Sequence, residues 1–94
     1  MISAERVQTG IRIEKRTLKV LRALADYLDL SLGDLLEGIV WHAFDGKTPF
    51  SDETLAQVAK LKTVYGLPLT AKHSHQLREV PAPHSKGVRK RAAK

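Results

Sequence analysis

The stretch that decides the fold is Val7-Gln8-Thr9-Gly10-Ile11-Arg12-Ile13. From Ile11 to Ile13 its side chains alternate between apolar and basic, and successive side chains of a strand point to opposite faces. Ile11 and Ile13 therefore share one face, and Gln8, Gly10 and Arg12 share the other. A lone strand has unpaired backbone along both edges, and no other stretch of the chain is clearly a strand. We predict that its partner is the same stretch of a second copy.

Two amphipathic helices are predicted to follow the strand. The first spans residues 17–28, and Glu14 or Thr17 caps its start. Asp29 tolerates the left-handed backbone at its end, and Ser31, with Asp34 three residues later, begins the second helix. The residues predicted to form the apolar stripes are Leu18, Leu21, Leu24, Ala25 and Leu28 in the first helix and Leu35, Leu36, Ile39, Val40 and Ala43 in the second.

A third helix is predicted to begin after Ser51 and to end at Gly66, because Gly followed by Leu67 and Pro68 is a strong stop signal. Trp41 lies on the otherwise polar stripe of the second helix, and we expect the third helix to fold back over it. After Leu69 the apolar pattern is lost, which predicts a disordered segment. The predicted organisation is a flexible arm (1–6), a strand-helix-helix domain (7–45), a loop and third helix packed on the core (46–69) and a disordered basic tail (70–94).

Length and composition limit the classes of protein to consider. The chain has 94 residues, enough for one domain, and it has no cysteine, so disulfides and thiolate metal sites are excluded. No apolar run approaches the roughly 20 residues that span a bilayer. Charged residues interrupt the N-terminal stretch, which does not resemble a signal peptide. We therefore expect a soluble, cytoplasmic protein.

The net charge of +6 is unevenly distributed. Basic residues dominate as far as Arg22, and the charged residues from there to residue 45 are all acidic. This gradient gives the strand end a positive potential that attracts a polyanion. In residues 70–94, Glu79 is the one acidic residue, and the basic residues are Lys72, Arg78, Lys86, Arg89, Lys90, Arg91 and Lys94. That segment either attracts DNA without sequence preference or is a solubilising end.

The order strand, helix, tight turn and helix within residues 7–45 resembles the ribbon-helix-helix family of DNA-binding proteins, which includes the Arc and MetJ repressors. The residues that carry the resemblance are Ile11-Arg12-Ile13, Leu18, Leu21, Leu24, Ala25 and Leu28, then Leu30-Ser31 before the second helix. The resemblance implies a mainly α fold assembled as an intertwined homodimer. It also implies a transcriptional regulator, such as a repressor, that inserts a two-stranded antiparallel ribbon into the major groove of DNA. One departure is Gly10, which leaves the middle of the outward face bare.

The resemblance assigns expected roles to individual residues. Arginine can bind guanine and glutamine can bind adenine through two hydrogen bonds, so the expected base-contacting residues are Gln8, Gly10 and Arg12. Basic side chains and the free amides at a helix start bind phosphate. The expected phosphate contacts are Lys15, Arg16, Lys19, Ser31, Leu32 and Gly33. The expected dimer core is Ile11, Ile13, Leu21, Leu28, Leu36, Ile39 and Val40.

Two other classes of function remain. In a dimeric adaptor, which includes an antitoxin-like protein, the ribbon would serve dimerisation alone. Trp41, the third helix and the C-terminal segment would then bind a partner protein. A metal site at His73, His75 and His84 is disfavoured, because two histidines two residues apart, with Glu79 as the nearby acid, make a weak site. No nucleophile–base pair or glycine-rich phosphate loop is evident in the sequence, so we predict neither an enzyme nor a cofactor.

Overall fold

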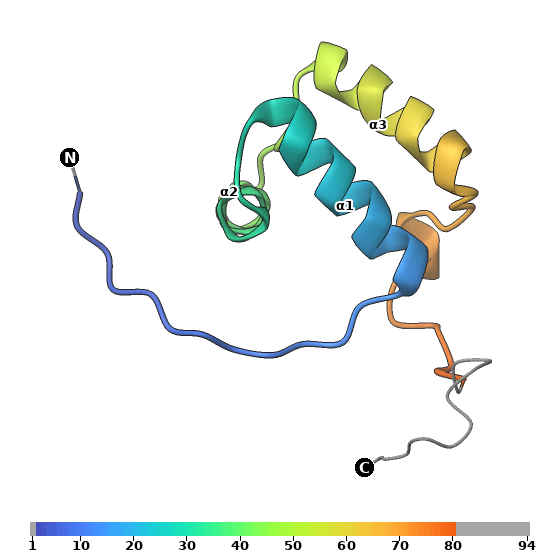
Figure 1. The fold of residues 1–94 in the computed structure, drawn as a ribbon, viewed down its shortest axis with the longest axis horizontal. Helices are drawn as coiled ribbons and strands as arrows, with labels where there is room; N and C mark the ends of the chain where they lie inside the picture. Colours follow the sequence, from blue (N-terminus) through green and yellow to red (C-terminus); the bar gives the residue numbers. More distant parts are fainter. Residues whose placement is uncertain (1, 81–94) are drawn as a thin grey trace.

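The computed structural model describes residues 2–80, and this part of the chain is mainly helical. The elements are α1 (Lys15–Leu28), α2 (Leu32–Phe44), α3 (Asp52–Tyr65) and a short 3-10 turn, η1 (Ala71–His73). Residues 2–14 lead away from the start of α1 without helix, and the described residues contain no strand (Figure 1). The mainly α class is therefore confirmed. The predicted strand pairing requires a second chain and stays a prediction.

Capping side chains determine where the three helices begin. The carboxylate of Glu14 accepts a hydrogen bond from the backbone N–H of Thr17, so α1 begins two residues earlier than predicted, and Glu14 is the cap. The hydroxyl of Ser31 accepts a bond from the Asp34 N–H, and that of Ser51 accepts one from the Thr54 N–H, each at 3.1 Å. These bonds satisfy N–H groups that have no partner within the helix.

Left-handed residues end α1 and α3 in the same way. Asp29 (φ 60°) and Gly66 (φ 64°) each turn the chain so that the next N–H bonds back to a carbonyl five residues earlier. The Leu30 N–H bonds to the Ala25 carbonyl at 2.9 Å, and this is the Schellman arrangement. Glycine has no side chain to strain this backbone, and aspartate is among the residues that tolerate it best. Both predicted helix ends are confirmed.

The core lies along α1, which runs between α2 and α3 (Figure 1). Leu24 and Ala25 of α1 and Leu35 of α2 are almost fully buried. The half-buried side chains packed around them are Leu21, Leu28, Ile39, Phe50, Val58 and Leu61. Helix α1 thus buries its apolar stripe against neighbours on two sides.

The prediction that the third helix covers Trp41 is wrong. Helix α3 packs against α1 and not against α2, and 60% of the Trp41 surface is exposed. The physical reason is that Val58 and Leu61 of α3 find apolar partners on the α1 stripe. Val40 and Ala43, which were predicted to lie on the buried face of the second helix, are exposed in the single chain, and the role of Val40 in a dimer core stays a prediction.

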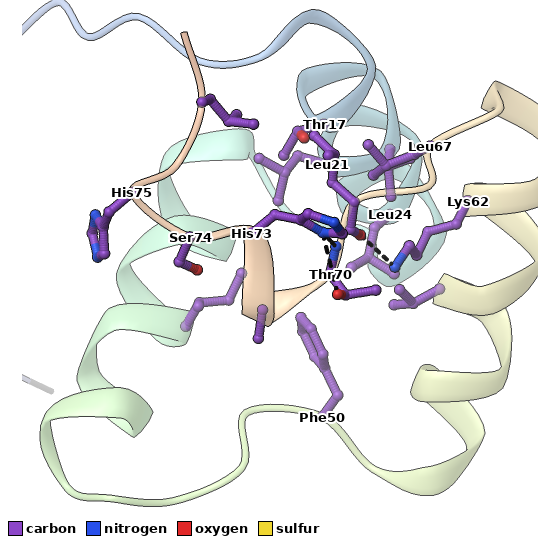
Figure 2. Close-up of a pocket in the computed structure, with 16 residues that line it drawn as sticks. Thr17, Leu21, Leu24, Phe50, Lys62, Leu67, Thr70, His73, Ser74 and His75 are labelled. Atoms are coloured by element: carbon purple, nitrogen blue, oxygen red, sulfur yellow. Dashed lines mark hydrogen bonds between the residues drawn. The ribbon is translucent and has the colours of Figure 1, made fainter.

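Residues 67–77 continue the fold beyond the point where the sequence predicted disorder. The Lys62 ammonium donates to the Leu69 carbonyl, and the Thr70 N–H donates to Nδ1 of His73, both at 2.9 Å. The segment lines an open groove of about 440 Å³ against α1 and α3, and Figure 2 shows His73 and Phe50 facing it. Order therefore extends at least to η1, because local bonds replace the missing apolar pattern. The end of the predicted tail, 81–94, lies outside the described residues.

Within residues 2–80, no helix combines the length and the apolar content that crossing a membrane requires.

Truncation of Leu24 should destabilise the chain most strongly. Its side chain is 2% exposed, so Leu24→Ala should lower the free energy of unfolding by about 2–5 kcal/mol through lost burial and the cavity left behind. Urea unfolding followed by circular dichroism measures this change. Val64→Ala is the control, because Val64 is 71% exposed on α3 and should change stability by less than about 0.5 kcal/mol. Equal losses in the two variants would contradict the assigned core.

Candidate nucleic-acid interface

The residues expected to read bases lie on the extended segment before α1. Gln8, Gly10 and Arg12 are all exposed. On the opposite face of the predicted strand, Ile13 is half-buried and Ile11 is 68% exposed. Among the described residues, the backbone of 2–13 makes no hydrogen bond to other backbone. The side chains on the predicted outward face are therefore exposed, and the backbone N–H and C=O groups of the segment have no backbone partner in the described chain.

Arg12 is paired with an acidic residue from the other end of the described chain. Its guanidinium forms a two-pronged contact with the Glu79 carboxylate, in which Nε donates to one oxygen and the terminal nitrogen lies against the other. Both side chains are largely exposed. The contact brings the C-terminal segment beside the residue that is expected to read a base.

The start of α1 is built around Glu14. Partial burial acts to raise the pKa of its carboxyl, but hydrogen bonds from the Thr17 N–H, the Thr17 hydroxyl and Arg16 outweigh this and lower the pKa to about 2. The carboxylate therefore stays charged and fixes the direction in which residues 7–13 leave the helix. It also places a negative charge at the positive end of the α1 dipole.

The three basic residues expected to bind phosphate at α1 have different surroundings. Lys15 and Lys19 are exposed and lie four residues apart, on one face of the helix. Arg16 is half-buried, and its guanidinium donates to Glu14 and to the Gly66 carbonyl, each at 3.0 Å. Arg16 therefore ties the start of α1 to the end of α3, whereas the two lysines are accessible to a ligand.

The expected phosphate contacts at α2 lie beside an acidic cluster. Ser31 and Gly33 are exposed, and Leu32 is half-buried. Ser31 uses its hydroxyl for the Asp34 N–H. The Asp34 carboxylate does not complete a capping box but binds Arg6 at 3.2 Å. A phosphate bound here would be repelled by the carboxylates in the first turns of α2 unless a nearby positive charge offset them.

Arg6 supplies that balance, and the sequence reasoning did not identify it. Its guanidinium donates to both oxygens of Glu37, at 2.9 and 2.8 Å, as well as to Asp34. The hydrogen bond and charge of Arg6 lower the pKa of Glu37, and Glu37 in turn raises the pKa of Arg6. The partners are 28 and 31 residues apart in sequence, so no local pattern could predict this contact. It holds the arm against α2.

The expected dimer-core residues are partly uncovered in the single chain. Ile13, Leu21, Leu28, Leu36 and Ile39 are half-buried, whereas Ile11 and Val40 are exposed. Phe44 is 80% exposed and extends the Leu36–Val40 stripe at the same four-residue spacing. That spacing was the signal by which the sequence could have identified Phe44 as part of this surface.

His73 and His75 are the described histidines of the C-terminal segment. Residues 2–80 hold no cluster of three or more metal-ligating side chains. His73 instead caps η1 through Nδ1, and the candidate ligand His84 lies outside the described residues.

Comparison with protein-family models, curated proteins and solved structures finds no match for this chain. Function is therefore inferred from the arrangement of the residues alone.

The Glu14 cap should make stability depend on pH in an acidic window. Because the folded-state pKa is about 2 and the ordinary value is 4.5, the cap stabilises fully above pH 4.5, and this stabilisation is lost as pH falls towards 2. Glu14→Gln should lower the free energy of unfolding at pH 7 by about 1 kcal/mol and flatten its pH dependence in that window. Urea unfolding at several pH values measures both effects.

Glu53→Gln is the matched control, since it removes the same charge from an exposed position in the first turn of α3. An identical flattening in the two variants would rule out the Glu14 cap as its source.

Proposed function

We propose that this chain is a dimeric DNA-binding protein of the ribbon-helix-helix type and acts as a transcriptional regulator. The observation that carries the proposal is the extended segment before α1. Its backbone at residues 2–13 makes no backbone hydrogen bond within the described chain, and its Val7 and Ile11 side chains are 80% and 68% exposed. Pairing with the same segment of a second copy would satisfy these groups and cover these side chains.

The small core supports dimerisation. Only Val20, Leu24, Ala25 and Leu35 are buried among the described apolar residues, and a domain of this size is marginally stable alone. A second copy placed against Ile11 and the Leu36–Val40–Phe44 stripe would enlarge the core. Two-fold symmetry brings the same surface of each copy together, so one exposed apolar face on the chain is enough to form a dimer interface.

The outward face of the ribbon supports DNA as the ligand. In an antiparallel ribbon, two copies of Gln8 and Arg12 would lie on the face opposite Ile11, where a two-stranded ribbon enters the major groove. Lys15 and Lys19 are exposed just beyond the strand and would lie near the phosphates. With Gly10 in the middle of the strand, each copy offers two side chains for base contacts.

The α2 start would add a phosphate contact in this assembly. The backbone amides of Leu32 and Gly33 are free helix-start donors, and Gly33 has open space around its Cα. Asp34 and Glu37 would repel an anion there, and the Arg6 pair offsets that charge. Arg6 therefore has a supporting role in the proposed phosphate clamp.

A dimeric protein-interaction adaptor is the second candidate function. The observation that favours it is the exposure of Trp41, because a tryptophan that is 60% exposed beside an 80% exposed phenylalanine is the kind of side chain found at the centre of protein interfaces. Trp41→Ala separates the two functions. It should leave DNA affinity unchanged if Trp41 serves a partner protein, whereas loss of DNA binding together with the dimer would assign Trp41 to the dimer itself.

Ile11 should control the oligomeric state. Ile11→Asp would place a carboxylate on the inner face of the proposed ribbon, so the dimer should dissociate at protein concentrations where the parent chain stays dimeric. Sedimentation equilibrium measures this shift. Ile2→Asp is the control, because Ile2 is 94% exposed and precedes the strand. A parent chain that is monomeric at all concentrations would contradict the proposal.

Arg12 and Lys19 should affect DNA binding differently. Arg12→Ala should cost about 1–3 kcal/mol on the preferred duplex and relax its sequence preference. Lys19→Ala should weaken all duplexes alike and reduce the slope of log affinity against log salt by about 0.9. Duplexes selected from random DNA, followed by fluorescence anisotropy over a salt series, measure both effects.

Lys60→Ala is the control for net charge, because Lys60 is exposed on α3. If the parent chain bound no duplex at low salt, DNA binding would be excluded.

A further inference from the structure

We propose that Glu79 is a built-in competitor of DNA: its carboxylate occupies two of the Arg12 nitrogens and offsets the Arg12 charge, which weakens the contact of Arg12 with a duplex. The inference rests on the proposed function, because it concerns the residue proposed there to read a base. It assigns a role to the segment after α3, which has none in the two-stranded ribbon itself.

The first observation is the geometry of the pair. Both oxygens of the Glu79 carboxylate face the Arg12 guanidinium, through Nε and a terminal nitrogen. Arginine uses this same fork of donors for a guanine edge or a phosphate. A carboxylate held in this way occupies the pair of donors formed by Nε and one terminal nitrogen and offsets the charge of the guanidinium, so it weakens the contact that Arg12 can make with DNA.

The second observation is how the segment reaches Arg12. The bond from Lys62 to the Leu69 carbonyl joins the segment to α3, and the bond from the Thr70 N–H to His73 is local to the segment and shapes η1. Glu79 is thus connected to the body of the fold by the short stretch of chain that follows η1. A tether of a few residues keeps the local concentration of the carboxylate high, which favours an intramolecular pair over the same contact between free groups.

The third observation is the charge of the segment. Glu79 is the one acidic residue among residues 70–94, which are otherwise basic. A basic segment beside the positive strand end would be repelled, whereas Glu79 attracts Arg12. The one acidic side chain of residues 70–94 therefore lies against Arg12 of the predicted strand.

The exposure of both partners limits the size of the effect. The side chains of Arg12 and Glu79 are 82% and 63% exposed, so solvent and salt screen their attraction. Pairs of this kind correspond to about a two- to fivefold factor in an equilibrium constant. Glu79 therefore attenuates DNA binding and does not abolish it, and a duplex that engages Arg12 well can displace it.

The test compares Glu79→Gln with Glu53→Gln, which makes the same change in net charge on an exposed residue of α3. With a random-sequence duplex at low salt, Glu79→Gln should bind about two- to fivefold more tightly than the control and show a steeper dependence on salt. In an Arg12→Ala background, the advantage of Glu79→Gln over Glu53→Gln should disappear. Equal affinities of the two glutamine variants, or an advantage that persists without Arg12, would overturn the competition.

A measurement without DNA keeps this inference separate from the proposed function. The Arg12 Nε–H signal in nuclear magnetic resonance spectra, assigned by its loss in Arg12→Ala, should shift in Glu79→Gln and stay in place in Glu53→Gln. An unchanged signal would overturn the pairing whether or not the chain binds DNA. The signal could shift in Glu79→Gln while neither the parent chain nor the glutamine variants bind a duplex. That result would overturn the proposed function, and the competition with it.

Discussion

The packing of α1 between two neighbours is the constraint on which the rest of the structure depends. Its apolar stripe is wide enough to need cover on both sides, and Leu24 and Ala25 become buried because α2 and α3 each supply part of that cover. Once α3 has taken its side of α1, it cannot also cover α2. The outer face of α2, with Val40 and Phe44, is left exposed, and so is most of the extended segment before α1.

The junction at Glu14 links the packing of the helices to the direction of the proposed DNA-binding segment. The carboxylate caps α1 and holds Arg16, and Arg16 bonds to the carbonyl at the end of α3. The last residue before the helix is therefore connected to the far end of the third helix. A change in how α3 seats on α1 would alter the direction in which residues 7–13 leave the fold.

Ion pairs then fix the two ends of the extended segment. Arg6 is held by Asp34 and Glu37 of α2, and Arg12 is held by Glu79 of the C-terminal segment. Each pair joins a basic residue of the segment before α1 to an acidic residue far away in the sequence. Arg6 and Arg12 are therefore paired with carboxylates within the chain, whereas Lys15 and Lys19 are exposed close to the start of α1.

The sequence by itself determined the three helices, the serine caps of α2 and α3 and the ends of α1 and α3, but it left the cap of α1 open between Glu14 and Thr17. Ser31, Ser51, Asp29 and Gly66 act through hydrogen bonds and backbone angles that involve residues fewer than six positions away, so a local pattern is sufficient to predict them. The same local reasoning predicted Leu24, Ala25 and Leu35 as core residues, since helical spacing places them on one face.

Only the tertiary structure decided which helices touch and which charges pair. The spacing of apolar residues on α2 and α3 says that each must be covered, but not by what, and α3 covers α1 instead of Trp41. The pairs of Arg6 with α2 and of Arg12 with Glu79 join residues about 30 to 70 positions apart. The physical reason is that burial and charge attraction depend on distance in space and not on separation along the chain. The residue that each side chain contacts is therefore selected by the assembled fold. For residues 7–13, the pattern of alternation predicted a strand, whereas its accessible edges and its paired Arg12 emerged only from the folded chain.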